Sequence, residues 1–133
     1  MSVKVERIPG EPVLVATLAG KVTVEMVLDM FEQSARLAAQ IPGQVYRITD
    51  VRLSTTTYSE MVSILAEACR RNYAASVADP RFCGMLVGSR EWSKTYSENL
   101  KQGQHGRFNL PVFTSFDEAM QYITHHREIE WQH

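Results

Sequence analysis

The sequence predicts a small α/β sandwich in which a mixed, mostly parallel sheet is flanked by helices. Apolar segments with strand periodicity alternate along the chain with segments of helical periodicity, the order that parallel crossover connections produce. The first two strand segments are separated by a turn only, as in an antiparallel hairpin. The chain has 133 residues without a Pro/Gly/Ser-rich linker, which favours one domain over residues 1–133. The expected order is β-β-α-β-α-β-α-β-α.

Five segments have the pattern of strands. Residues 2–8 alternate between apolar and polar, as in a half-buried strand, and Pro9 and Gly10 then break the run. Residues 81–88 are almost continuously apolar, as in a strand that is covered on both faces. The expected strands span residues 2–8, 13–20, 44–51, 81–88 and 110–113.

Four segments have the pattern of helices. Thr23 can cap the first helix, and Pro42 and Gly43 end it. The third helix is expected to end at Gly103, and Ser115 with Glu118 forms a capping box for the fourth. The second helix is expected over 58–74 and the third over 90–102, and the apolar stripe of the second consists of Val62, Leu65, Cys69 and Tyr73. The tail that starts at His125 has no clear partner.

Composition excludes several classes of partner. The formal net charge is −1, so there is no electrostatic case for nucleic acid or an anionic membrane as the main partner. No apolar run is long enough for a signal peptide or a membrane span, so we expect a soluble, cytoplasmic protein. Cys69 and Cys83 match no metal-binding spacing and are expected to be reduced and buried.

The element order resembles the STAS fold of sulfate-transporter tails and anti-sigma-factor antagonists. The chain is most similar to the shorter, bacterial STAS-like group, in "LAGKVTVEMVLDMFEQ", "YRITDVR" and "LPVFTSFDEAMQYI". In the antagonist members, a serine or threonine at the start of the second helix is phosphorylated. The resemblance places Ser59 at that position, with Thr57 and Glu60 where the family has aspartate and glycine. It implies a regulatory module that binds a protein partner.

The hydroxyl-rich segment "STTTYSE" has a second interpretation. Thr57 and Glu60 have the spacing of a capping box, which stabilises the helix start by roughly 1 kcal/mol and needs no phosphate. Glu60 would also repel a phosphate on Ser59. The cap interpretation is therefore favoured, and the phosphorylation switch remains the alternative.

Further candidates lie where strands end. Asp50 and Arg52 follow the third strand, at the edge where open α/β sheets bind ligands, and a structural ion pair is favoured for them. Gly88, Ser89 and Arg90 follow the fourth strand and could complete a small anion or polar-ligand site there, although the segment lacks the pattern of a phosphate-binding loop.

Trp92 and Tyr96 are four residues apart in an otherwise polar helix. They are expected to be core residues or a partly exposed aromatic patch that suits a homodimer or another protein.

No arrangement of residues predicts catalysis. The sequence shows no nucleophile–base pairing and no Cys/His ligand set; His125 and His126 are adjacent, and His105 lies in a glycine-flanked loop without an acidic partner. We therefore expect a non-catalytic interaction module without metal or cofactor. The alternative is a small-ligand or lipid-binding domain of the Sec14/STAS-like kind, which would need a cavity lined by Met, Leu and aromatic residues.

Overall fold

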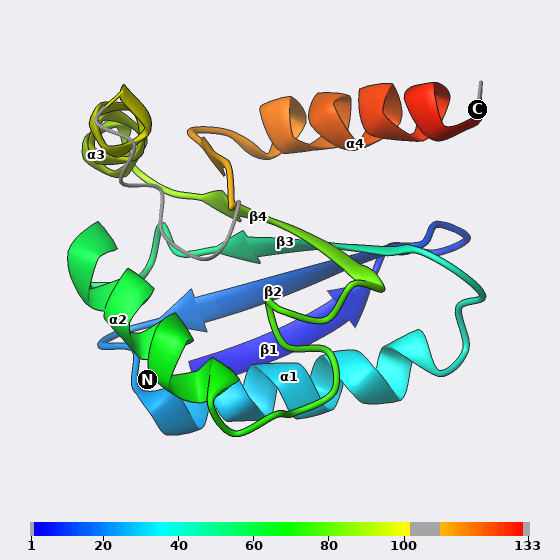
Figure 1. Cartoon of the computed structure of the whole chain (residues 1–133), viewed down its shortest axis with the longest axis horizontal. Helices are drawn as coiled ribbons and strands as arrows, with labels where there is room; N and C mark the ends of the chain where they lie inside the picture. Colours follow the sequence, from blue (N-terminus) through cyan, green and yellow to red (C-terminus); the bar gives the residue numbers. More distant parts are fainter. Residues whose placement is uncertain (1, 102–109, 132–133) are drawn as a thin grey trace.

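The computed structural model describes residues 2–101 and 110–131, and Figure 1 shows its strands and helices in the expected order. The strands are β1 (Ser2–Arg7), β2 (Val13–Ala19), β3 (Val45–Asp50), β4 (Phe82–Val87) and β5 (Val112–Phe113). The helices are α1 (Val24–Ala38), α2 (Tyr58–Cys69), α3 (Arg90–Lys101) and α4 (Phe116–Trp131). The expected end of the third helix at Gly103 lies outside the described residues.

The five strands form one sheet in the order β1-β2-β3-β4-β5. β1 pairs antiparallel with β2, and every later pair is parallel. The predicted hairpin at one edge and the mostly parallel sheet are both confirmed. Because each crossover leads to the next strand in the same direction, right-handed connections place the crossover helices on one side.

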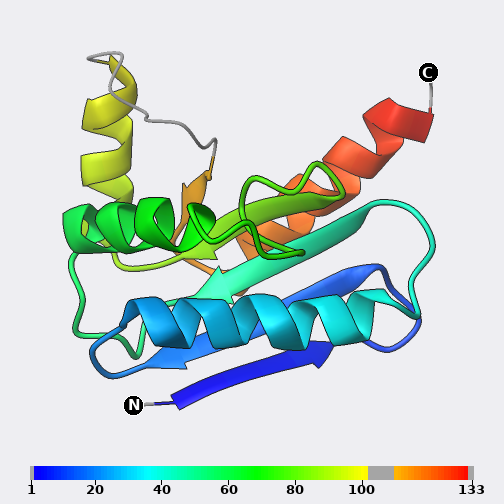
Figure 2. The ribbon, with the colours of Figure 1, turned by 60° about the horizontal axis from the view of Figure 1, so that its bottom comes forward.

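Helices cover both faces of the sheet. One apolar cluster lies between the sheet and the helices α1 and α2, and a second lies beneath α4. Figures 1 and 2 show α1 and α2 on one side of the sheet and α4 on the other. Alternate residues of β3 serve the two sides: Val45 belongs to the first cluster, and Tyr46 and Ile48 belong to the second. This double burial explains the continuous apolar pattern of β3 and β4.

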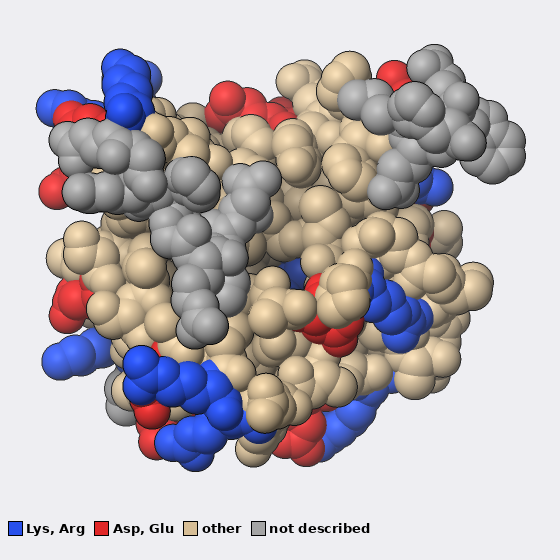
Figure 3. All heavy atoms as spheres, viewed as in Figure 1, with Lys and Arg blue, Asp and Glu red and all other residues tan. Residues whose placement is uncertain are grey.

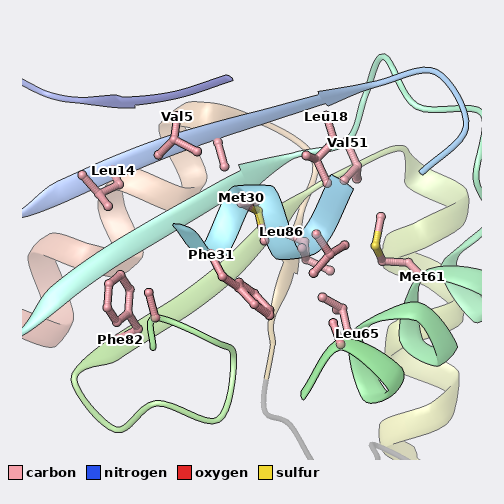
Figure 4. Packing of buried hydrophobic residues seen from close by; sticks show 14 of the residues in the cluster. Val5, Leu14, Leu18, Met30, Phe31, Val51, Met61, Leu65, Phe82 and Leu86 are labelled. Carbon is pink, nitrogen blue, oxygen red and sulfur yellow. The ribbon is translucent and has the colours of Figure 1, made fainter. Parts of the chain in front are cut away.

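The larger core is filled by side chains from α1, α2 and the sheet. Met30 and Phe31 of α1 meet Leu65 of α2 and Leu86 of β4, as Figure 4 shows. Met30 and Phe31 are at most 1% exposed. Full burial of such side chains stabilises the fold by roughly 1.5–3 kcal/mol each.

The apolar stripe predicted for the second helix is partly wrong. Leu65 is buried, but Val62 and Tyr73 are exposed, and Cys69 is half-buried. The helix ends at Cys69, so Tyr73 lies in the following loop and cannot continue a helical stripe. The buried side chains of α2 are Tyr58, Met61, Leu65 and Ala68. Cys83 is also half-buried, so the expectation that both cysteines are buried is wrong.

The segment after His125 does have partners, contrary to the expectation. It continues α4 to Trp131. The Tyr46 hydroxyl and Nδ1 of His126 lie at hydrogen-bond distance, 2.9 Å apart, beneath this helix. Arg127 forms an ion pair with Glu11 at 2.8 Å, which ties α4 to the hairpin loop. His133 and His105 lie outside the described residues.

The outer edge of β1 is covered in part by α1. The backbone N–H of Val5 donates to Oε1 of Gln33 at 3.1 Å. The amide of Gln33 is in turn fixed by Asp29, one turn earlier on α1, at 3.2 Å. A side chain therefore occupies a backbone donor that an edge strand would otherwise present to other chains.

Arg47 is a buried cation in the middle of β3, with 1% of its surface exposed. Its guanidinium lies over the rings of Phe31 and Phe82, with distances of 5.3 and 5.0 Å to the ring centroids. Nη1 donates to the carbonyl of Ala75 at 2.6 Å. Burial lowers the pKa of Arg47 to about 10, while the Asp79 carboxylate opposes the decrease, so the group stays charged at neutral pH.

The Arg47 contact fixes the loop between α2 and β4. Ala75 has a positive φ of 65°, a conformation that L residues rarely adopt. Its carbonyl accepts from Arg47, and its N–H donates to Oδ2 of Asp79 at 2.8 Å. The peptide groups on both sides of Ala75 are thus held by charged side chains, which compensates for the unfavourable backbone conformation.

We predict that Arg47→Met lowers the free energy of unfolding by about 1–3 kcal/mol, because it leaves the buried Ala75 carbonyl without its donor. The matched control is Arg52→Met, which removes an exposed ion pair and should cost less than about 1 kcal/mol. Urea unfolding of both variants measures the difference. Equal losses would contradict the role given to Arg47.

Candidate functional site

A hydroxyl-lined pocket lies where α2 and α3 begin. The loops after β3 and β4 leave the sheet at the same edge, because these strands are parallel, and Figure 2 shows the two helices meeting there. The pocket has a volume of about 310 Å³. Its lining residues are Ser54, Thr55, Thr56, Thr57, Tyr58, Ser59, Ser89, Glu91, Trp92 and Thr95.

The loop between β3 and α2 is held by hydrogen bonds to the loop between β2 and α1. The N–H of Gly20 donates to the Leu53 carbonyl, and the Thr55 N–H donates back to the Gly20 carbonyl, each at 3.0 Å. The buried Thr56 hydroxyl accepts from the N–H of Val22 at 2.8 Å. The loop therefore has a fixed backbone, and it presents Leu53 to solvent with 68% of its surface exposed.

The predicted capping box at the start of α2 is confirmed. Thr57 Oγ1 accepts from the Glu60 N–H at 3.2 Å, and the Glu60 carboxylate accepts from the Thr57 N–H at 2.9 Å. The Thr57 backbone donor, followed by its side chain, lowers the pKa of Glu60. Ser59 is exposed in the first turn of the helix, so its hydroxyl is accessible.

Asp50 and Arg52 form the ion pair that was favoured for them. Nη2 of Arg52 lies 2.8 Å from Oδ2 of Asp50, and Nε and the backbone N–H of Arg52 also donate to this carboxylate. Partial burial acts to raise the pKa of Asp50, but the hydrogen bonds and charge of Arg52 outweigh it, and the pKa is lowered. Neither residue lines the pocket.

The residues after β4 have separate roles. Ser89 caps α3, because its Oγ accepts from the Trp92 N–H at 3.3 Å, and it lines the pocket. A Cβ at Gly88 would lie 3.2 Å from Trp92 Cβ and Cγ, so this position favours glycine. Arg90 is exposed and does not line the pocket. Ser89 is therefore the one residue of the predicted edge site that lines this pocket. The other predicted residues, which do not line it, are Asp50, Arg52, Gly88 and Arg90.

Trp92 is a core residue and not an exposed interface residue, contrary to the second of the two expectations. It is 8% exposed and packs edge-on against Tyr58, with 5.8 Å between ring centroids. Tyr96 is half-buried and also contacts Tyr58, at 6.5 Å. Partial burial, together with the proximity of Tyr96, raises the pKa of Tyr58, so its phenol stays protonated at neutral pH.

A lipid-binding domain would need an apolar cavity, and the apolar hollow that the described core residues line is almost filled. Within the described residues, a hollow lined by Met30, Met61, Leu65 and other core residues has a volume of about 10 Å³, roughly the space of one water molecule. Leu110 packs over Gly84 of β4, where an added Cβ would lie 2.8 Å from Cδ2 of Leu110. As formed by the described residues, this hollow is too small for a lipid chain.

Residues 2–101 and 110–131 contain neither a metal-binding cluster nor a helix suited to cross a membrane. No group of three or more His, Cys, Asp or Glu side chains there is arranged to bind a metal ion. None of the helices in that part of the chain combines the length and apolar character that a membrane crossing requires.

Sequence reasoning did not single out several pocket residues. Ser54 and Thr56 belong to the hydroxyl-rich segment, but only the folded loop places them at the pocket: Thr56 accepts from Val22 of the neighbouring loop, and its own N–H donates to Ser54. Glu91 and Thr95 lie one helical turn apart, and the Thr95 hydroxyl donates to the Glu91 carbonyl at 3.0 Å. Their spacing predicts a shared helix face, and the position of α3 against α2 then turns that face toward the pocket.

Comparison with known proteins identifies the fold. No protein-family model matches the sequence, and no curated protein matches it significantly. A similar solved structure is an uncharacterized protein from Shewanella loihica PV-4, described as a DUF3478-family protein with a SpoIIAA-like fold. The two chains share 14% identity over 91% of each, with a TM-score of 0.54. The chain therefore has a SpoIIAA-like fold, the STAS-like architecture that its sequence predicts.

We predict that Thr57→Ala lowers the free energy of unfolding by about 1 kcal/mol, because it removes the cap acceptor of α2. The control is Thr55→Ala, which changes an exposed side chain in the same loop and should stay within about 0.5 kcal/mol of the wild type. Thermal or urea unfolding of the two variants is the measurement, and comparable losses would argue against the cap.

We predict that Arg52→Gln raises the pKa of Asp50. A pH titration of the carboxyl ¹³C NMR signal of Asp50 measures this change. Because the folded pKa of Asp50 is lowered, the ion pair stabilises the protein above the ordinary pKa and this contribution disappears as the pH falls through the lowered value. The stability difference between wild type and variant should therefore shrink below about pH 4. Arg127→Gln, which breaks the distant pair with Glu11, should leave Asp50 unchanged.

Proposed function

We propose that the chain is a non-catalytic regulatory module of the bacterial cytoplasm that binds a protein partner through the surface at the start of α2. The observation that carries this proposal is the loop between β3 and α2. It combines a hydrogen-bonded backbone with an exposed leucine and a row of accessible hydroxyls. A loop that is already ordered loses little conformational entropy when it binds, and this favours recognition by a partner.

The surrounding surface also suits a protein partner. On the face that Figure 3 shows, acidic and basic side chains of the described residues are interspersed. Together with the net charge of −1, this gives no electrostatic reason to favour nucleic acid. The SpoIIAA-like fold supports a STAS-like domain, and the partner and the regulatory role are our proposal.

Phosphorylation of Ser59 is an optional part of the proposal. Ser59 is exposed, and it lies in the first turn of a 12-residue helix, whose N-terminal end favours negative charge. A phosphate would add about −1.5 to −2 charge to the proposed docking surface. The neighbouring Glu60 carboxylate opposes this addition, so the modification would weaken or reorganise the capping box.

Site-specific photo-crosslinking in the native host tests partner binding. A photoreactive phenylalanine analogue at Leu53 should form an adduct with one defined protein, identified by mass spectrometry. The control position is Tyr73, which is also exposed but lies before β4, at the opposite end of the parallel strands. Equal crosslinking from both positions, or none from Leu53, would contradict the proposal.

Intact-mass and native mass spectrometry of the chain purified from its host test the switch. We predict a mass increase of one phosphate that is lost in Ser59→Ala and kept in Ser63→Ala, an exposed serine one turn further along α2. An unmodified mass would leave the segment as a helix cap. The same native spectrum reports whether the chain is a homodimer.

A further inference from the structure

We infer that the pocket between α2 and α3 binds a neutral, polyhydroxylated small molecule of about monosaccharide size. The inference goes beyond the proposed function, which needs a protein partner but no small molecule. Three observations support it: the chemistry of the pocket lining, the capping bonds that the first-turn amides of α2 and α3 already make, and the size of the pocket.

The lining is rich in hydroxyls and poor in charge. Seven of its ten residues are serine or threonine, and Glu91 is the charged residue among them. Tyr58 and Trp92 complete the lining, and both are at least nine-tenths buried. Among the described residues, neither the Tyr58 hydroxyl nor the Trp92 indole N–H has a hydrogen-bond partner. Neither atom is among the fully buried polar atoms without a partner in that part of the chain, so both are accessible from the pocket, and a ligand seated there gains two further groups to bond.

An anion is disfavoured, although two helix N-termini meet here. Helix N-termini bind anions through their free backbone N–H groups. In each helix one first-turn amide, the N–H of Glu60 in α2 and of Trp92 in α3, already donates to the capping hydroxyl of Thr57 or Ser89, so fewer amides remain for an anion. Each helix also has a glutamate in its first turn, Glu60 in α2 and Glu91 in α3, which repels an anion.

The remaining hydrogen-bonding capacity suits hydroxyl groups. The hydroxyl oxygens of Ser54, Thr57 and Ser89 accept from backbone N–H groups, so their protons are left to donate. Across the pocket the Thr95 hydroxyl donates to a backbone carbonyl, so its lone pairs are left to accept, as are the oxygens of Glu91. A ligand that both donates and accepts at several positions matches this arrangement.

Size and polarity agree with the same class of ligand. A volume of about 310 Å³ is at the lower end of the range of small-molecule pockets, which is about 300–1,000 Å³. An apolar ligand of this size would leave the lining hydroxyls without partners, which is costly. A molecule with several hydroxyl groups avoids that loss.

NMR titration of the ¹⁵N-labelled chain tests the inference, with myo-inositol, D-glucose and glycerol as neutral probes, inorganic phosphate as the anion and ethanolamine as the cation. We expect amide shifts in residues 54–59 and 89–95 with myo-inositol or glucose, and weaker or absent shifts with the charged probes. Tighter binding of phosphate or ethanolamine than of any polyol overturns the inference. A pocket that responds to none of the five probes also overturns it.

Matched variants locate the binding. Thr95→Val keeps the side-chain shape and removes one hydroxyl, and it should weaken polyol binding about threefold to tenfold. Thr124→Val is the control. The Thr124 hydroxyl, like that of Thr95, donates to the backbone carbonyl four residues earlier, but Thr124 lies on α4, away from the pocket. Equal affinities of the two variants would place binding elsewhere. The titration uses the isolated chain, so its failure would leave the crosslinking result at Leu53 unaffected.

Discussion

Parallel pairing of β2, β3 and β4 is the constraint on which the rest of the structure depends. Parallel strands must be joined by crossovers and are buried on both faces, so α1 and α2 cover one side and α4 the other. The same pairing brings the ends of β3 and β4 to one edge of the sheet. Two helices therefore begin side by side, and the pocket forms between their first turns.

The hydroxyl groups at this edge stabilise the fold, whether or not they also bind a partner or ligand. Thr57 and Ser89 cap the two helices, and Thr56 joins the loop to the neighbouring one. A partner or ligand can use only the hydrogen-bonding capacity of these hydroxyls that the structural bonds do not already occupy. The cap and switch interpretations of the segment are thus compatible, since Ser59 lies outside the capping box and is exposed.

Local patterns were enough to predict the fold and the helix caps. Strand alternation, the Pro9–Gly10 turn and the Thr57–Glu60 spacing are properties of neighbouring residues, and the element order and capping box are as expected. The errors arise where a distant contact decides. For Trp92 the sequence left core and surface open, and packing against Tyr58 of α2 decides for the core. The end of α2 is followed by a loop anchored by Arg47 from the middle of β3, which no local pattern indicates.

The bond from Val5 to Gln33 bears on how copies of this chain can associate. β1 is one border of the sheet, and part of its hydrogen-bonding edge is already satisfied by α1. The other border, β5, is two residues long and offers little backbone for pairing. Both features reduce the backbone that is available for pairing with a strand of another molecule, a means by which natural sheets limit edge-to-edge association. Association through the side-chain surfaces of the helices and loops is correspondingly favoured.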